Sequence, residues 1–124
     1  MKRTHTNLGA WRESMALVKQ IYQSTSKFPR EEQFGLTSQI RRAAVSIPAN
    51  IAEGAARGTK KEFSQFLIIA RGSLSELETL LAIAFEVGFL EKAALSVLET
   101  QLDSVSKLLS GLLRASRYEQ CAKS

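Results

Sequence analysis

The chain has 124 residues and a mass of 13.7 kDa, enough for one domain that buries a core without disulfides or metals. Hydrophobic residues make up 44% and charged residues 23%, and no apolar run reaches the roughly 18 residues of a membrane span, which argues against a disordered chain and a membrane protein. A net charge of +5 favours anionic partners.

The start of the chain lacks the apolar segment of a secretory signal, so we expect a cytoplasmic protein. No internal repeat, low-complexity segment or linker divides the chain, so we expect a single domain over residues 1–124 with an ordered core over about 10–117. The residues before and after that core are expected to fray.

The first periodic segment, residues 10–26, predicts an amphipathic helix. Its apolar stripe contains Trp11, Met15, Val18, Tyr22 and Thr25, and is widened by Leu17 and Ile21. Pro29 ends this helix, because a residue that precedes proline avoids helical angles. Residues 29–34 then predict a short turn before the next helix.

The second predicted helix begins near Thr37, a plausible N-cap, and ends near Arg57. Pro48 lies inside it and has no N–H for the helix, which costs about 3 kcal/mol in a free helix. The apolar stripe nevertheless continues in phase from Ile47 to Ile51. We therefore predict a kink at Pro48 without a break, with Asn50 within hydrogen-bonding reach of a backbone carbonyl or a polar side chain.

The third helix is predicted to start at the capping box formed by residues 59–62, TKKE. Gly72 in its interior predicts close approach by another backbone. Besides its core stripe, this helix carries a second apolar stripe that a four-helix core does not need, and we expect its burial between subunits or against a connector. The second stripe consists of Ile69, Leu80, Ile83 and Val87.

Gly88 predicts the end of the third helix, and residues 91–116 predict a fourth with leucines at heptad spacing. Helices joined by short connections pack as antiparallel neighbours, and no segment shows the alternation of a strand. The fold class is therefore predicted to be all-α, an antiparallel up-and-down four-helix bundle with the second helix kinked at Pro48.

The sequence offers no set of residues for catalysis. The only histidine, His5, has no second histidine or cysteine cluster to complete a zinc site, and no Glu-x-x-His pair suggests a di-iron bundle. Glycine-rich phosphate loops and a nucleophile elbow are also absent. We predict that the protein is not an enzyme and needs no cofactor or metal.

Positive charge gathers in the middle of the chain, and the following third is acidic. The candidate phosphate contacts for a nucleic acid are Arg41, Arg42, Arg57, Lys60 and Lys61. Trp11, Phe63 and Phe66 sit at core spacing, so they are poor platforms for stacking bases. The acidic stretch from Glu76 to Asp103 must lie on a different face, or it cancels the positive patch.

A polar stripe also follows the second helix at spacings of three or four residues. Besides arginines it contains Gln39, Ser46, Asn50 and Glu53. Such a stripe is either a partner or ligand site, or a structural feature in which Glu53 pairs with Arg57 and Asn50 supports the backbone near Ser46.

Residues 34–54, FGLTSQIRRAAVSIPANIAEG, followed by Arg57, resemble the signature of the 23S rRNA-intervening-sequence protein family, also called the four-helix bundle protein family. Trp11 and residues 66–67, 70–74 and 76–79 match as well. These bacterial proteins have no assigned biochemical role, and the family is similar in fold to the accessory protein of diversity-generating retroelements, a basic pentameric bundle that binds nucleic acid and a reverse transcriptase. The resemblance implies a bundle, a homopentamer and binding of RNA or DNA; it implies no enzyme.

Two functions remain open at this point. The first is an oligomeric nucleic-acid-binding or ribonucleoprotein accessory module, with the protein itself and RNA or DNA as partners. The second is a structural or protein–protein interaction module that binds no nucleic acid and uses the polar stripe to contact another subunit or a different protein.

Overall fold

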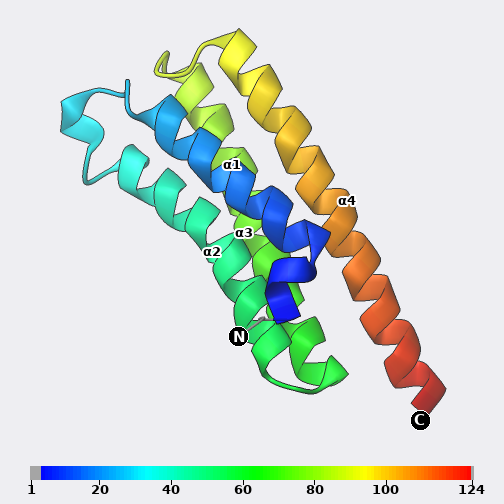
Figure 1. Ribbon diagram of the computed structural model, residues 1–124. Coiled ribbons are helices and arrows are strands. Elements are labelled where there is room, and N and C mark those ends of the chain that lie inside the picture. The colour runs from blue at the N-terminus through cyan, green and yellow to red at the C-terminus, as the bar shows by residue number, and fades with distance from the viewer. Residues whose placement is uncertain (1–3, 124) are drawn as a thin grey trace.

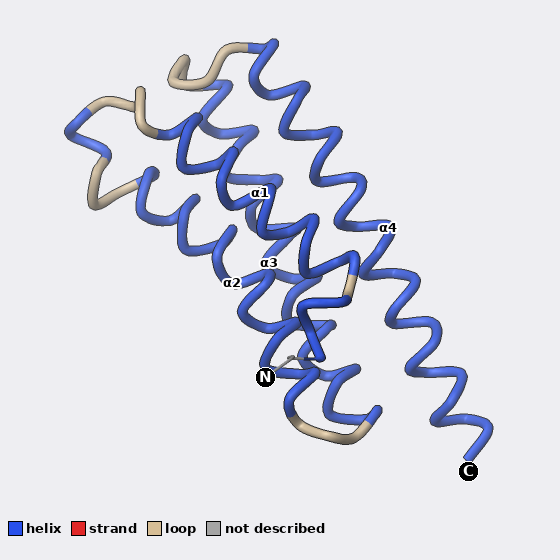
Figure 2. The backbone as a smooth tube through the Cα atoms, in the orientation of Figure 1, coloured by secondary structure: helices blue, strands red, loops and turns tan. Residues whose placement is uncertain are grey.

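A computed structural model of the protein describes residues 4–123, with side chains described as far as Ser116. The four long helices are α1 (Gly9–Thr25), α2 (Leu36–Ala56), α3 (Lys60–Glu86) and α4 (Lys92–Lys123). Two short 3-10 turns, η1 (Thr4–Asn7) and η2 (Arg30–Glu32), precede α1 and α2 (Figure 1). The part of the chain that the structure describes contains no strand, and the all-α prediction is confirmed (Figure 2).

The helices form an antiparallel up-and-down bundle. α1 packs against α2 and α4, and α3 packs against the same two helices, whereas α2 and α4 lie on a diagonal and make no contact with each other. Short connections keep chain neighbours adjacent and antiparallel, as Figure 1 shows. The side of α2 that faces away from the core is therefore far from the outer side of α4.

One hydrophobic core joins all four helices. Its largest fully buried side chains are Leu17, Ile21, Ile40, Ile47, Ile51, Leu67, Leu77, Leu81, Leu98, Leu102, Val105 and Leu109. On α4 these residues keep the predicted heptad spacing, because each returns to the same face after three or four residues.

The predicted stripe of α1 was wrong at two positions. Met15 and Tyr22 are each 44% exposed, whereas Leu17 and Ile21, which were expected to widen the stripe, are fully buried together with Ser14. A helix with apolar residues at many positions offers two overlapping stripes, and the neighbouring helices decide which one is buried. Ser14 tolerates burial because its hydroxyl donates to the carbonyl of Trp11 at 2.8 Å.

The start of α2 also differs from the prediction. Gly35 is the N-cap and Thr37 lies inside the first turn, where it is buried. The capping oxygen comes from the preceding turn, since Oε1 of Glu32 accepts a hydrogen bond from the backbone N–H of Leu36 at 3.1 Å.

Pro48 lies inside a continuous α2 and is buried, so the proline does not end the helix, as predicted. Asn50 donates through Nδ2 to the carbonyl of Ser46 at 2.8 Å, which confirms the expected contact with the backbone one turn earlier.

Gly72 was predicted to admit another backbone, and that prediction is wrong within this chain, because a Cβ there would meet no atom within 4 Å. The close approach occurs at Gly54, where a Cβ would lie 2.8 Å from Cβ of Phe66 and 3.0 Å from Cδ1 of Phe63. Gly58 has a φ of +87° and turns the chain from α2 into α3.

Helical structure extends beyond the predicted helices at both ends of the chain. η1 forms a turn over Thr4–Asn7, where fraying was expected, and His5 packs edge-on against Trp11 with ring centroids 5.0 Å apart. α4 continues to Lys123 instead of ending near Ser116. The predicted frayed residues 1–3 and 124 lie outside the described part of the chain. Over the residues described, no helix is long and apolar enough to cross a membrane.

Candidate nucleic-acid interface

The five basic candidate residues fall into two groups at opposite ends of α2. Arg41 and Arg42 lie near its start, beside the connector from α1, and form the connector-end group. Arg57, Lys60 and Lys61 lie around the turn into α3 and form the turn-end group. The helix rises about 1.5 Å per residue, so Arg42 and Arg57 are roughly 22 Å apart along its axis. One subunit therefore presents two basic groups and not one compact patch.

Arg41 is held in place by α1. Its Nε donates to Oγ1 of Thr25 at 2.9 Å, and its Nη2 donates to the carbonyl of Tyr22 at 3.4 Å. The guanidinium also stacks on the ring of Tyr22, with Cζ 4.5 Å from the ring centroid. Thr25 is buried and donates its own hydroxyl proton to the carbonyl of Ile21. These contacts orient the Arg41 charge without neutralising it, because no carboxylate takes part.

Arg42 and Lys61 are exposed, and neither forms an ion pair with any residue that the structure describes. Arg57 is different: its Nη2 lies 2.6 Å from Oε1 of Glu53, and its Cζ lies 5.0 Å from the centroid of the Phe66 ring. The pair at i,i+4 is half-exposed, so it adds at most about 1 kcal/mol to stability. Arg57 therefore carries a charge that is partly compensated, whereas Arg42 and Lys61 carry charges that only solvent compensates.

The middle of the polar stripe joins α2 to α3. Oγ of Ser46 lies 2.8 Å from Oγ of Ser73, and Nδ2 of Asn50 donates to the same Ser46 oxygen at 2.9 Å. Because Ser46 accepts from Asn50, its own hydroxyl proton is available for Ser73. Gln39 and Glu53 of the stripe are exposed. Ser46 and Asn50 are thus used structurally, in agreement with the structural interpretation of this stripe.

Two aromatic residues that sequence reasoning left out lie beside the connector-end group. Tyr22 and Phe34 line an open hollow of about 430 Å³ together with Arg41 and Arg42. Phe34 is 92% exposed, although it was expected only as part of a connecting turn. The apolar periodicity of α1 placed Tyr22 on the core stripe, so the sequence did not indicate that its ring is a surface group. The arginine pair seven and eight residues after Phe34 was the one signal in the sequence that pointed to this place.

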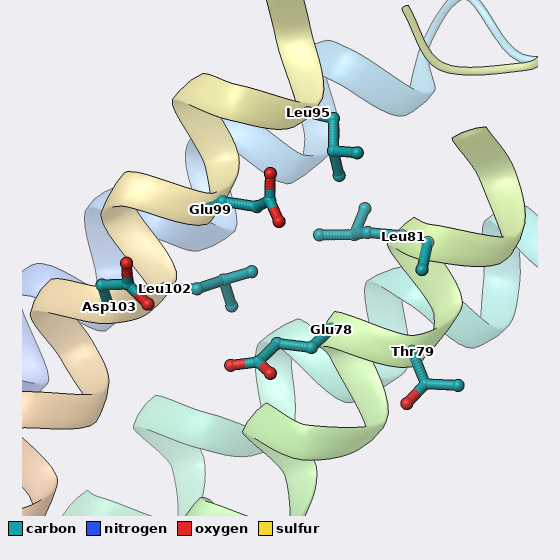
Figure 3. A pocket seen from close by; sticks show the side chains of 8 residues that line it. Glu78, Thr79, Leu81, Leu95, Glu99, Leu102 and Asp103 are labelled. Atoms are coloured by element: carbon teal, nitrogen blue, oxygen red, sulfur yellow. The ribbon is translucent and has the colours of Figure 1, made fainter. Parts of the chain in front are cut away.

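A second hollow, of about 380 Å³, lies between α3 and α4. Figure 3 shows its apolar floor and its rim of carboxylates. The carboxylates are those of Glu78, Glu99 and Asp103, and the floor consists of Leu81, Leu95 and Leu102. The rim carboxylates come from α3 and α4, and the backbones of α2 and α4 do not approach each other. These carboxylates are on other helices than the connector-end group, whereas Glu53 and Glu62 lie beside the turn-end group.

The exposed arginines and lysine around α2 are suited to anion binding. Among the residues that the structure describes, no group of three or more histidine, cysteine, aspartate or glutamate side chains is placed to hold a metal ion. Cys121 lies beyond Ser116, outside the described side chains.

A comparison with curated proteins found no match. Among solved structures, one that matches is the crystal structure of a protein of unknown function from the S23 ribosomal protein family of Bacteroides thetaiotaomicron VPI-5482. The two chains are 21% identical and superpose with a TM-score of 0.75 over 84% of this chain and 97% of that one, which shows a shared fold. The model of the 23S rRNA-intervening sequence protein family matches residues 6–111. Most of the described bundle lies inside this match, and the chain therefore belongs to the 23S rRNA-intervening sequence protein family.

Proposed function

We propose that the protein is a cytoplasmic, non-enzymatic and oligomeric binding module that contacts the backbone of RNA or DNA. The observation that carries this proposal is the placement of exposed positive charge. Arg42 and Lys61 stand at the two ends of α2 without an ion pair among the described residues, while the carboxylates of Glu78, Glu99 and Asp103 gather between α3 and α4.

Phosphate groups are the ligand that fits this charge pattern. Arg42 and Arg57 lie roughly 22 Å apart along the axis of α2, which corresponds to six or seven phosphates at about 3.4 Å per base step. Lys61 follows in the first turn of α3, so a strand that runs along α2 can meet basic side chains at both places. Between the two groups, Ser46 and Asn50 are neutral, and the carboxylate of Glu53 is paired with Arg57. This contact is sequence-independent, because it reads the backbone and not the bases.

Self-association is the second part of the proposal. Ile69 and Ile83 on α3 are 50% and 43% exposed, and its C-cap Val87 is 54% exposed, so most of the surplus stripe is not used by the core of one chain, while Leu80 is buried. Exposed apolar side chains that gather on one helix face favour burial against another subunit. Five copies are expected from the similarity to the retroelement accessory protein, and a ring would repeat each basic group around its axis.

The test is a fluorescence titration of RNA and DNA at several salt concentrations. We expect the double variant Arg42→Ala/Lys61→Ala to bind more weakly at low salt and to show a shallower dependence of log K on log salt, by about 0.9 for each lost contact with a duplex phosphate. The matched control is Lys92→Ala/Lys107→Ala, which removes the same charge from exposed positions on α4.

Equal losses in both double variants would mean that only net charge matters and would remove the assignment to α2. Absence of binding by the wild-type protein at about 50 mM salt would exclude nucleic acid as the ligand and favour the protein-interaction module.

A further inference from the structure

The exposed side chain of Phe34 is the starting point. A single exposed apolar residue carries little meaning by itself, because much of any protein surface is apolar. Phe34 is unusual because its ring is 92% exposed and shares one hollow with a second exposed aromatic residue, Tyr22, and with two arginines. The residues Tyr22, Phe34, Arg41 and Arg42 are called the aromatic notch below.

The notch is rigid on one side and open on the other. Tyr22 is covered on one face by the guanidinium of Arg41, which three contacts to α1 hold in place. Arg42 has no ion pair among the described residues, and Phe34 lies next to Gly35, the N-cap of α2. An aromatic ring thus stands on the surface beside two cations with fixed backbone positions.

This combination is the one that binds a nucleotide whose base is not stacked on its neighbours. A base offers its π-face to an aromatic ring, and its phosphate pairs with an arginine. In a duplex the bases are stacked on one another, so Phe34 has no face to contact. In a single strand the faces are free.

We propose that the aromatic notch binds single-stranded RNA or DNA by stacking a base on Phe34 while Arg41 and Arg42 bind the adjoining phosphates. This inference rests on the proposed function and adds to it a strand type and a stacking residue. The turn-end group then holds the backbone farther along the same strand. Stacking does not distinguish one base from another, so we expect the notch to tolerate any base.

The experiment compares two single-stranded probes with equal phosphate numbers, each about twelve nucleotides long, a typical length for such sites. One is oligothymidine and the other is the abasic deoxyribose-phosphate strand. The wild-type protein is expected to prefer oligothymidine. Phe34→Ala is expected to weaken oligothymidine binding by about 5- to 150-fold, while leaving abasic-strand binding unchanged.

Two variants separate stacking from general effects. Phe34→Trp keeps a stacking ring, so it should bind oligothymidine about as tightly as wild type does. The introduced indole adds fluorescence to that of the wild-type protein, and this added fluorescence should decrease when oligothymidine binds but not when the abasic strand binds. Val97→Ala removes another exposed apolar side chain, 57% exposed on α4 and outside the notch, and should bind both probes as wild type does.

Equal binding of the two probes by wild type, or no effect of Phe34→Ala, overturns the stacking inference but leaves backbone binding standing. Failure to bind these probes and duplex alike overturns both proposals. A changed particle mass of Phe34→Ala in light scattering would assign Phe34 to a contact between subunits, and would overturn the inference as well.

Discussion

At Gly54, α2 leaves no room for a side chain. A Cβ there would lie 2.8 Å from Cβ of Phe66 and 3.3 Å from the carbonyl oxygen of Phe63, and neither atom belongs to the flexible end of a side chain. The sequence places Gly54 near the end of a helix, where glycine usually loosens the chain, yet the structure uses it to bring α2 and α3 together. Gly111 in α4 has no such role, since a Cβ there would meet nothing within 4 Å.

We therefore expect Gly54→Ala to lower the free energy of unfolding by roughly 1–2 kcal/mol, because overpacking outweighs the gain in helix propensity of about 1 kcal/mol. The matched variant Gly111→Ala should raise it by about 0.5–1 kcal/mol, since alanine is the better helix former. Urea unfolding curves of both variants test this pair. Equal effects of the two substitutions would show that helix propensity alone determines the change in unfolding free energy.

At the scale of a helix, the start of α3 is the best-defined local signal. Oγ1 of Thr59 accepts a hydrogen bond from the backbone N–H of Glu62 at 3.2 Å, as the capping box predicts. The return contact differs, because Oε1 of Glu62 accepts from the Thr59 hydroxyl at 3.0 Å and not from its backbone N–H. The box still fixes where α3 begins, since one otherwise unpaired N–H is satisfied.

Thr59→Ala should lower the free energy of unfolding by about 0.5–2 kcal/mol, the usual cost of a lost N-cap. Thr100→Ala is the control, because that exposed hydroxyl bonds only to the carbonyl of Ser96 within α4. Its removal should change stability by no more than about 0.5 kcal/mol. Thermal unfolding followed by circular dichroism measures both, and a Thr100→Ala loss as large as that of Thr59→Ala would contradict the capping role.

At the scale of the whole molecule, the proposed self-association depends on one apolar surface. Ile69, Ile83 and Val87 expose apolar surface on one side of α3 that the core of one chain does not use. Gly72 lies on the same side and has open space around it, so a partner helix can come close there. In the proposed assembly, the close approach that the sequence suggested for Gly72 would occur between subunits.

Light scattering is expected to give a particle of about five times the 13.7 kDa of one chain. The double variant Ile69→Glu/Ile83→Glu should shift this mass towards that of the single chain, because carboxylates resist burial without partners. Val97→Glu, on the exposed side of α4, should leave the mass unchanged. A wild-type mass of one chain would refute the assembly, and an unshifted mass in the double variant would place the contact elsewhere.

The sequence by itself determined the number and type of the helices, the start of α3 and the continuity of α2 through Pro48. These features depend on local physics: the spacing of apolar residues, a capping hydroxyl, and an apolar stripe that stays in phase past the proline. Membership of the family also follows from sequence alone, because the motif over residues 34–54 is long.

Only the tertiary structure decided which side chains meet. Tyr22 reads as core in the periodicity of α1, but α2 and α4 cover the face that carries Leu17 and leave the ring of Tyr22 outside. The connector then brings Phe34 beside it, although twelve positions separate the two residues in the sequence. The charge of Arg42 near the start of α2 is likewise far from that of Lys61 in the first turn of α3, because the rigid α2 lies between them and rises about 1.5 Å per residue. Periodicity specifies a face, and packing between helices specifies what that face contacts.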